Sequence, residues 1–179
     1  KPDMITANSG SNDVSILLNS CSAAKGNLFD YNGDRKTDYS VFRPSTTQYF
    51  IQTLNQFGAA KVLGRPNDVL VPADFNGDRK TDFAYYRPES GLWVVQENSF
   101  GFGRPIYFLQ FGLPEDIPMP ADYDGDGKAD LAVFRPSEGN WYIRRSTDNA
   151  LQTIRFGSVG DKPVAADFDG DTIADIAVY

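Results

Sequence analysis

Four short acidic segments carry the residues whose types and spacing suit metal chemistry. Each is nine residues long, with Asp at positions 1, 5 and 9, Asp or Asn at position 3 and Gly at position 4. Side-chain oxygens at positions 1, 3, 5 and 9, with a backbone carbonyl at position 7, can surround a hard cation at about 2.3–2.6 Å. The segments are residues 30–38, 74–82, 122–130 and 167–175, at offsets of 44, 48 and 45 residues.

This pattern predicts four calcium sites. Magnesium fits the pattern less well, because it demands a rigid octahedron and keeps several waters. The position-7 residue of each segment is expected to contribute only its backbone oxygen. The predicted ligands are Asp30, Asn32, Asp34, Lys36 and Asp38; Asp74, Asn76, Asp78, Lys80 and Asp82; Asp122, Asp124, Asp126, Lys128 and Asp130; and Asp167, Asp169, Asp171, Ile173 and Asp175.

The alternative is that these segments are ordinary Asp-Gly turns. Four copies in register favour the metal, because three or four carboxylates within a few ångströms repel one another unless a cation lies between them. The third and fourth segments have four carboxylates, whereas the first two have three and an Asn. We therefore expect the first two sites to release calcium first on chelation.

Position 12 argues against an EF-hand, in which a bidentate Glu occupies that position and helices flank the loop. Here position 12 is Val or Tyr and lies in a run typical of a strand. These residues are Val41, Tyr85, Val133 and Val178.

The elements around each acidic segment repeat as well. An extended run, an Arg-Pro turn, a second run that begins near an aromatic residue, and a third run follow each complete segment. Short β-rich runs between Gly, Pro, Asn and Asp turns indicate strands, and no window has the period of a helix. The sequence therefore predicts an all-β protein, and four strands in each unit of about 40–50 residues are typical of a β-propeller blade.

The strand inventory predicts a single domain over residues 1–179 with four-stranded blades at about 24–64, 69–111 and 117–157. A fourth blade shared by 163–179 and 1–20 would close a four-bladed ring by pairing of the terminal strands. The alternative is an arc or half of a larger propeller, because the residues after Asp3 and after Asp175 look like the same blade position. The first residue is Lys rather than Met, so we expect a mature or trimmed product whose export signal is gone.

Composition limits the function. The chain of 179 residues has 24 acidic and 17 basic residues, a net charge of −7, no His and one Cys. It therefore lacks a His base, a zinc cluster or a disulfide framework, and nucleic acid and anionic membranes are poor partners. No apolar run approaches the roughly 20 residues of a membrane-spanning helix. Four calcium ions would offset the negative charge, which is then a sign of metal rather than of a basic partner.

An enzyme is not expected. Fourteen of the 24 acidic residues belong to the four segments. The spacing of the remaining glutamates gives no reason to pair any two as catalytic carboxylates. These glutamates are Glu89, Glu97, Glu115 and Glu138.

Two further elements stand in register with the acidic segments. Phe-Gly pairs occur at 57–58, 111–112 and 156–157, and the runs 71–73, 119–121 and 164–166 precede an acidic segment. With these elements the chain resembles the FG-GAP repeats of the integrin α-subunit propeller and their bacterial relatives. The resemblance implies a calcium-binding β-propeller that is secreted or on the cell surface. Two departures are Arg35, Arg79 and Thr172 at position 6, where the family often has Gly, and a blade number below the family's usual seven or eight.

Arginine and an aromatic residue also recur in each complete unit, at Arg43, Arg87 and Arg135 and at Tyr49, Trp93 and Trp141. Such pairs could form pockets between blades that bind sugar rings, as in propeller lectins resembling this family. The sequence favours a packing role, in which the aromatic fills the core and Arg binds a loop carbonyl or a nearby Asp.

Together these observations predict a secreted or cell-surface calcium-binding β-propeller module, monomeric or homodimeric, that binds an extracellular protein or glycan. Calcium would brace the blade loops. The alternatives are a carbohydrate-binding lectin with repeated pockets and an architectural spacer within a larger protein.

Overall fold

A computed structural model describes residues 5–7, 14–16, 29–43, 45–53, 56–62, 64–98 and 106–179 of the chain. These residues form strands joined by turns, and none of them is helical. The strands are β1 (Ile5–Ala7), β2 (Val14–Ile16), β3 (Tyr39–Arg43), β4 (Gln48–Thr53), β5 (Gln56–Val62), β6 (Val69–Leu70), β7 (Phe83–Arg87), β8 (Leu92–Gln96), β9 (Ile106–Gln110), β10 (Ile117–Pro118), β11 (Leu131–Arg135), β12 (Asn140–Arg144), β13 (Leu151–Arg155), β14 (Pro163–Ala166) and β15 (Asp175–Val178). The prediction of an all-β protein is confirmed.

The strands pair antiparallel with their neighbours in sequence. Strands β6 to β9 and β10 to β13 form two four-stranded sheets, and β3 to β5 form a three-stranded sheet. The pairs β1–β2 and β14–β15 are separate two-stranded sheets. Among the described strands, no pairing joins these two sheets, so the closed four-bladed ring stays a prediction.

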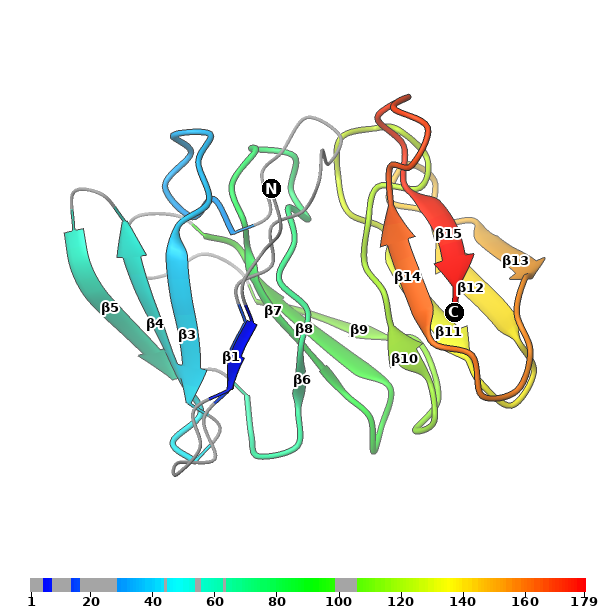
Figure 1. Ribbon diagram of the computed structural model, residues 1–179, viewed down its shortest axis with the longest axis horizontal. Helices are drawn as coiled ribbons and strands as arrows, with labels where there is room; N and C mark the ends of the chain where they lie inside the picture. The colour runs from blue at the N-terminus through cyan, green and yellow to red at the C-terminus, as the bar shows by residue number, and fades with distance from the viewer. Residues whose placement is uncertain are drawn as a thin grey trace.

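In the view of Figure 1, the sheets β3–β5, β6–β9 and β10–β13 follow one another across the molecule, and β1 lies between β3 and β6. In the same view the acidic segments lie at one edge, at the top of the picture, where they precede β3 or connect β6 to β7, β10 to β11 and β14 to β15. We call them the first (30–38), second (74–82), third (122–130) and fourth (167–175) loops. The repeated sheets thus bring four similar loops to one side of the protein.

Apolar side chains from adjacent sheets pack together in common hydrophobic clusters. One buried cluster combines Trp93 of β8 with Leu131 and Val133 of β11. Another combines Tyr49 of β4 with Phe83 of β7. The inner strands therefore bury both faces, as β11 shows with four consecutive buried residues, and this burial is the main favourable term that holds neighbouring sheets together.

The Phe-Gly element connects the end of a sheet to its own hairpin. The carbonyl of Phe156 accepts a 3.0 Å hydrogen bond from Nε1 of Trp141, and the Phe156 N–H donates to the Gly139 carbonyl at 3.1 Å. A Cβ on Gly139 would collide with the Gly157 carbonyl oxygen. The preceding sheet repeats this arrangement with Trp93, Phe111, Gly91 and Gly112.

The first Phe-Gly assignment was wrong. Phe57 and Gly58 lie inside β5, where Phe57 pairs with Gln52 of β4, whereas the other two Phe-Gly pairs follow the last strand of their sheets. Gly64, which comes after β5 with a φ of 78°, occupies the corresponding place. The motif search failed because the residue before Gly64 is Leu rather than Phe.

Candidate metal centres in the acidic loops

The second, third and fourth acidic loops are each closed at their base by antiparallel pairing of the residues that flank them. In the third loop the Asp130 N–H donates to the Ala121 carbonyl at 2.8 Å, and in the second loop Asp82 donates to Ala73 at 2.8 Å. In the fourth loop Asp175 pairs with Ala166. The sheets therefore fix the two ends of these three loops, so that the residues between them must curve.

Side-chain carboxylates hold that curve through the backbone. In the third loop Asp122 accepts hydrogen bonds from the N–H groups of Gly125 at 2.6 Å and Gly127 at 2.8 Å. Asp124 accepts from the Asp126 N–H at 3.2 Å, and Asp126 in turn accepts from Lys128 at 2.8 Å. The other three loops repeat these bonds at the same positions.

Position 6 adopts a left-handed backbone in all four loops. Gly127 has a φ of 86°, and the residues that depart from the family pattern have φ values of 65°, 67° and 77°. Glycine adopts this conformation without steric cost, whereas other residues lose about 1–2 kcal/mol. Arg35, Arg79 and Thr172 thus keep the loop geometry, and the only difference from Gly is this steric cost of the left-handed backbone.

In the second and third loops the carboxylate at position 9 is desolvated and fixed. Asp130 is fully buried, and its two oxygens accept hydrogen bonds from the N–H groups of Tyr123 at 2.9 Å and Ser146 at 2.6 Å. Asp82 is held in the same way by Phe75 and Asn98. Burial raises the pKa of Asp82 and Asp130 to about 6, although these N–H groups act in the opposite direction.

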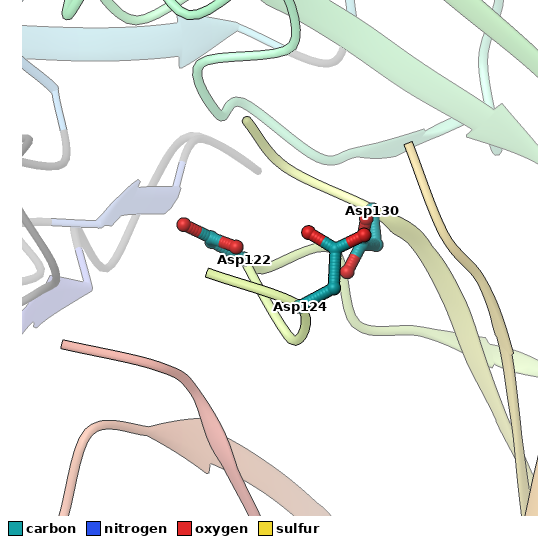
Figure 2. A group of neighbouring side chains, drawn as sticks. All are labelled: Asp122, Asp124 and Asp130. Atoms are coloured by element: carbon teal, nitrogen blue, oxygen red, sulfur yellow. The ribbon is translucent and has the colours of Figure 1, made fainter. Parts of the chain in front are cut away.

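In the third loop the carboxylates at positions 1, 3 and 9 converge. Asp122, Asp124 and Asp130 each offer an oxygen, and these oxygens lie within 4.8 Å of one another. Figure 2 shows the three side chains on this one loop. Two oxygens bound to the same calcium at about 2.3–2.6 Å are at most about 5 Å apart, so the observed spacing fits one such ion.

The fourth loop brings together Asp167, Asp169 and Asp175 with the same spacing. The position-5 carboxylates Asp126 and Asp171, which the sequence also predicts as ligands, are outside these groups. In the first two loops Asn32 and Asn76 occupy position 3, so fewer carboxylates can converge there. The donor set is oxygen throughout, which suits a hard cation rather than zinc or copper.

Successive loops are joined by a repeated hydrogen bond that sequence reasoning missed. The N–H at position 8 donates to the position-1 carbonyl of the preceding loop, at 2.8, 2.7 and 2.7 Å for the three junctions. These pairs are Thr81 with Asp30, Ala129 with Asp74, and Ala174 with Asp122. No sequence motif predicts this hydrogen bond, because it depends on how neighbouring sheets stack.

The repeated aromatic residues lie in the core. Trp93 and Trp141 are 0% exposed and Tyr49 is 4% exposed. Trp141 packs against Phe134 with ring centroids 5.5 Å apart, and its N–H is used by the Phe156 carbonyl. The structure thus shows these aromatic faces in packing contacts.

Two of the repeated arginines bind aspartates that the sequence analysis did not single out. Arg135 forms bonds of 2.8 and 3.0 Å to Asp116, and Arg87 forms bonds of 3.0 and 2.9 Å to Asp68. Each Asp precedes its Arg by 19 residues, a repeated spacing that could have revealed the pair. Arg43 lies over the ring of Phe50 at 4.9 Å.

The fold and the loops together define a class: an all-β repeat protein in which four of the five described sheets are accompanied by an acidic, oxygen-rich loop. The family model of the FG-GAP-like repeat matches residues 74–133 and 122–178, which is more than half of the chain. The chain belongs to the FG-GAP-like repeat family. No curated protein and no solved structure shows a significant match to it. Within the described part of the chain, no helix is long and apolar enough to cross a membrane.

Proposed function

We propose that this chain is a calcium-binding β-propeller module for extracellular binding or adhesion. The observation that carries the proposal is the convergence of three carboxylates in each of the third and fourth loops, with oxygens within 4.8 Å of one another. Membership of the FG-GAP-like repeat family supports it, because repeats of this kind often bind calcium and are typical of extracellular proteins.

Calcium would be held by the residues at positions 1, 3, 5 and 9 of each loop and by the position-7 carbonyl. The bound ion supplies positive charge that offsets the repulsion between the carboxylates. A cation that binds the folded loops and not the unfolded chain stabilises the fold by mass action. Hydrogen bonds to the loop backbone already fix the curved conformation of the loops, so the ion would stabilise a conformation that exists before it binds.

The proposed architecture is a four-bladed ring in which residues 163–179 and 1–20 share the last blade. The repeated junctions between successive loops support a regular stacking of sheets. The ring predicts a monomer with a mass in solution near 19.8 kDa. Twice that mass would favour assembly from two halves.

We place the protein outside the cell or on its surface, where calcium is abundant enough to fill weak sites, and we propose no catalytic activity. The partner is an extracellular protein or a glycan. The fully buried indoles of Trp93 and Trp141 give no support to the lectin pockets considered above. An array of glycans and extracellular proteins, read with calcium and with chelator, tests this role. Binding that is lost with chelator is expected, whereas no binding in either state would favour an architectural spacer.

Thermal unfolding tests the calcium proposal itself. Calcium added to the metal-stripped chain should raise Tm by several degrees, and equimolar magnesium should raise it less. The variant Asp124→Asn keeps an oxygen acceptor for the Asp126 N–H and removes one charge, so its calcium response should shrink. Glu89→Gln removes one charge from an exposed turn and serves as the control. An identical Tm with and without calcium would refute the proposal.

A further inference from the structure

The hairpin between β12 and β13 packs against the third loop. Two backbone hydrogen bonds close its turn: the Arg145 N–H donates to the Ala150 carbonyl at 3.0 Å, and the Asn149 N–H donates to the Arg145 carbonyl at 3.0 Å. Arg145 also forms an ion pair with Asp148 across the turn. Ser146 and Thr147, which lie between these residues, therefore have a defined position.

These two residues bond three of the four carboxylates predicted to bind calcium in the third loop. The Ser146 N–H donates to Asp130 at 2.6 Å, and its hydroxyl donates to Oδ2 of Asp126 at 2.7 Å. The Thr147 hydroxyl donates to Oδ2 of Asp124. One hairpin thus contacts the loop at positions 3, 5 and 9, although Ser146 lies 16 residues after Asp130, where the loop ends.

The hairpin hydroxyls and the loop's own N–H groups bond different oxygens of the same carboxylates. The Oδ1 atoms of Asp124 and Asp126 accept the N–H groups of Asp126 and Lys128. Their Oδ2 atoms are bonded by the hairpin hydroxyls. Because the terminal torsion of Asp is broad, a second donor at Oδ2 is what restricts the plane of the carboxylate. A carboxylate oxygen has two lone pairs, so an oxygen that accepts a hydroxyl can still bind a cation.

We propose that Ser146 and Thr147 are positioning residues of the third calcium site, a role that rests on the function proposed above. They hold the carboxylates of Asp124 and Asp126 in place before the ion arrives. Residues that orient metal ligands in this way typically contribute about 10–100-fold to metal affinity.

The other loops provide comparisons within the same molecule. The hairpin after β8 offers the second loop the N–H of Asn98, which donates to Asp82 at 2.7 Å, while the Asn98 side chain donates to the Tyr31 carbonyl. In the described part of the chain, no hydroxyl bond reaches Asp169 or Asp171 of the fourth loop. Among the described residues, the fourth loop therefore has the same four carboxylates as the third without hairpin hydroxyls.

Site-resolved calcium titration tests the proposal. In amide NMR spectra of the isotope-labelled chain, the Gly125 and Gly127 signals report the third loop and the Gly170 signal reports the fourth. The double variant Ser146→Ala and Thr147→Val should weaken calcium binding at the third loop by about tenfold or more. Its Gly170 titration and its Tm in chelator should stay at wild-type values, because only ligand orientation has changed.

Two single variants complete the test. Thr147→Ser keeps the hydroxyl and should keep most of the calcium affinity of the third loop. Thr153→Ala alters an exposed threonine of β13 and should leave that affinity unchanged. Unchanged affinity at Gly125 in the double variant would overturn the positioning role. A loss of affinity that is equal at Gly125 and Gly170 would also overturn it, since the effect would not be local. Wild-type spectra that do not respond to calcium at any loop would instead refute the calcium proposal itself.

Discussion

Position 3 of the acidic loops decides how many carboxylates face a candidate ion. Asn76 holds the turn of the second loop by accepting the Asp78 N–H at 2.8 Å, a bond that Asp in the same place can also make. Asn76→Asp should therefore preserve the turn and add a charged ligand. Because ligand charge tunes calcium affinity, we expect binding at the second loop to tighten roughly tenfold, measured at the Gly77 amide. Gln152→Glu, which adds a charge on exposed β13, is the control; equal tightening in both variants would point to net charge alone.

Burial of Asp82 and Asp130 gives the metal-free protein a specific pH dependence. Their pKa values are raised from 3.8 to about 6 in the folded chain, so the folded state binds protons more tightly than the unfolded state between these values. The free energy of unfolding should consequently fall as pH rises from about 4 to about 6. Urea unfolding of the metal-stripped chain across this range measures the effect. A free energy that increases steadily through the same window would contradict the burial argument.

The Arg135–Asp116 pair is a residue-scale test of stability. The Asp116 side chain is fully buried and that of Arg135 is 14% exposed. Asp116→Ala should cost about 3 kcal/mol, because it removes the buried carboxylate partner of a largely buried guanidinium and leaves only the longer 3.3 Å contact to Glu138. Asp161 occupies the corresponding turn of the next repeat and accepts the Ser158 N–H at 2.8 Å. Among the described residues, no arginine pairs with Asp161. Urea unfolding in saturating calcium should show a smaller loss for Asp161→Ala, and equal losses would assign the effect to the turn.

At the scale of elements, the close approach of two turns fixes each sheet. Gly139 has a φ of 67°, and a Cβ there would meet the carbonyl of Gly157, which is backbone and cannot move aside cheaply. Gly139→Ala should therefore destabilise the chain by about 2–4 kcal/mol. Gly160 also has a positive φ but has open space around it, so Gly160→Ala should cost only about 1 kcal/mol. A smaller loss for Gly139→Ala in chemical denaturation would show that the turns can separate.

The strands and loops were accessible from the sequence because each is encoded locally. Alternating apolar residues and Gly or Asp turns repeat in every unit, and four copies removed the ambiguity of any single one. The hydroxyls of Ser146 and Thr147 were not accessible, since they meet Asp124 and Asp126 only after β11, β12 and β13 pair. The Phe57-Gly58 error has a related cause: the two letters match a motif, but strand pairing places them inside β5.

At the scale of the whole molecule, repetition links the loops in a row. The position-1 carbonyl of one loop accepts the position-8 N–H of the next at three successive junctions. A change in one loop therefore acts on the backbone of its neighbour. The sequence predicted the number of loops but neither their shared side nor this connection, because both depend on how the sheets stack. Closure of the ring depends on the terminal strands and stays a prediction.

Counting the calcium ions bound by the metal-stripped chain tests the central claim most directly. Titration calorimetry with the bound ions counted by native mass spectrometry gives both the stoichiometry and the affinities. Each chain should bind four calcium ions, with the third and fourth loops filled at lower calcium than the first and second. A chain that binds no calcium at millimolar concentration would contradict it.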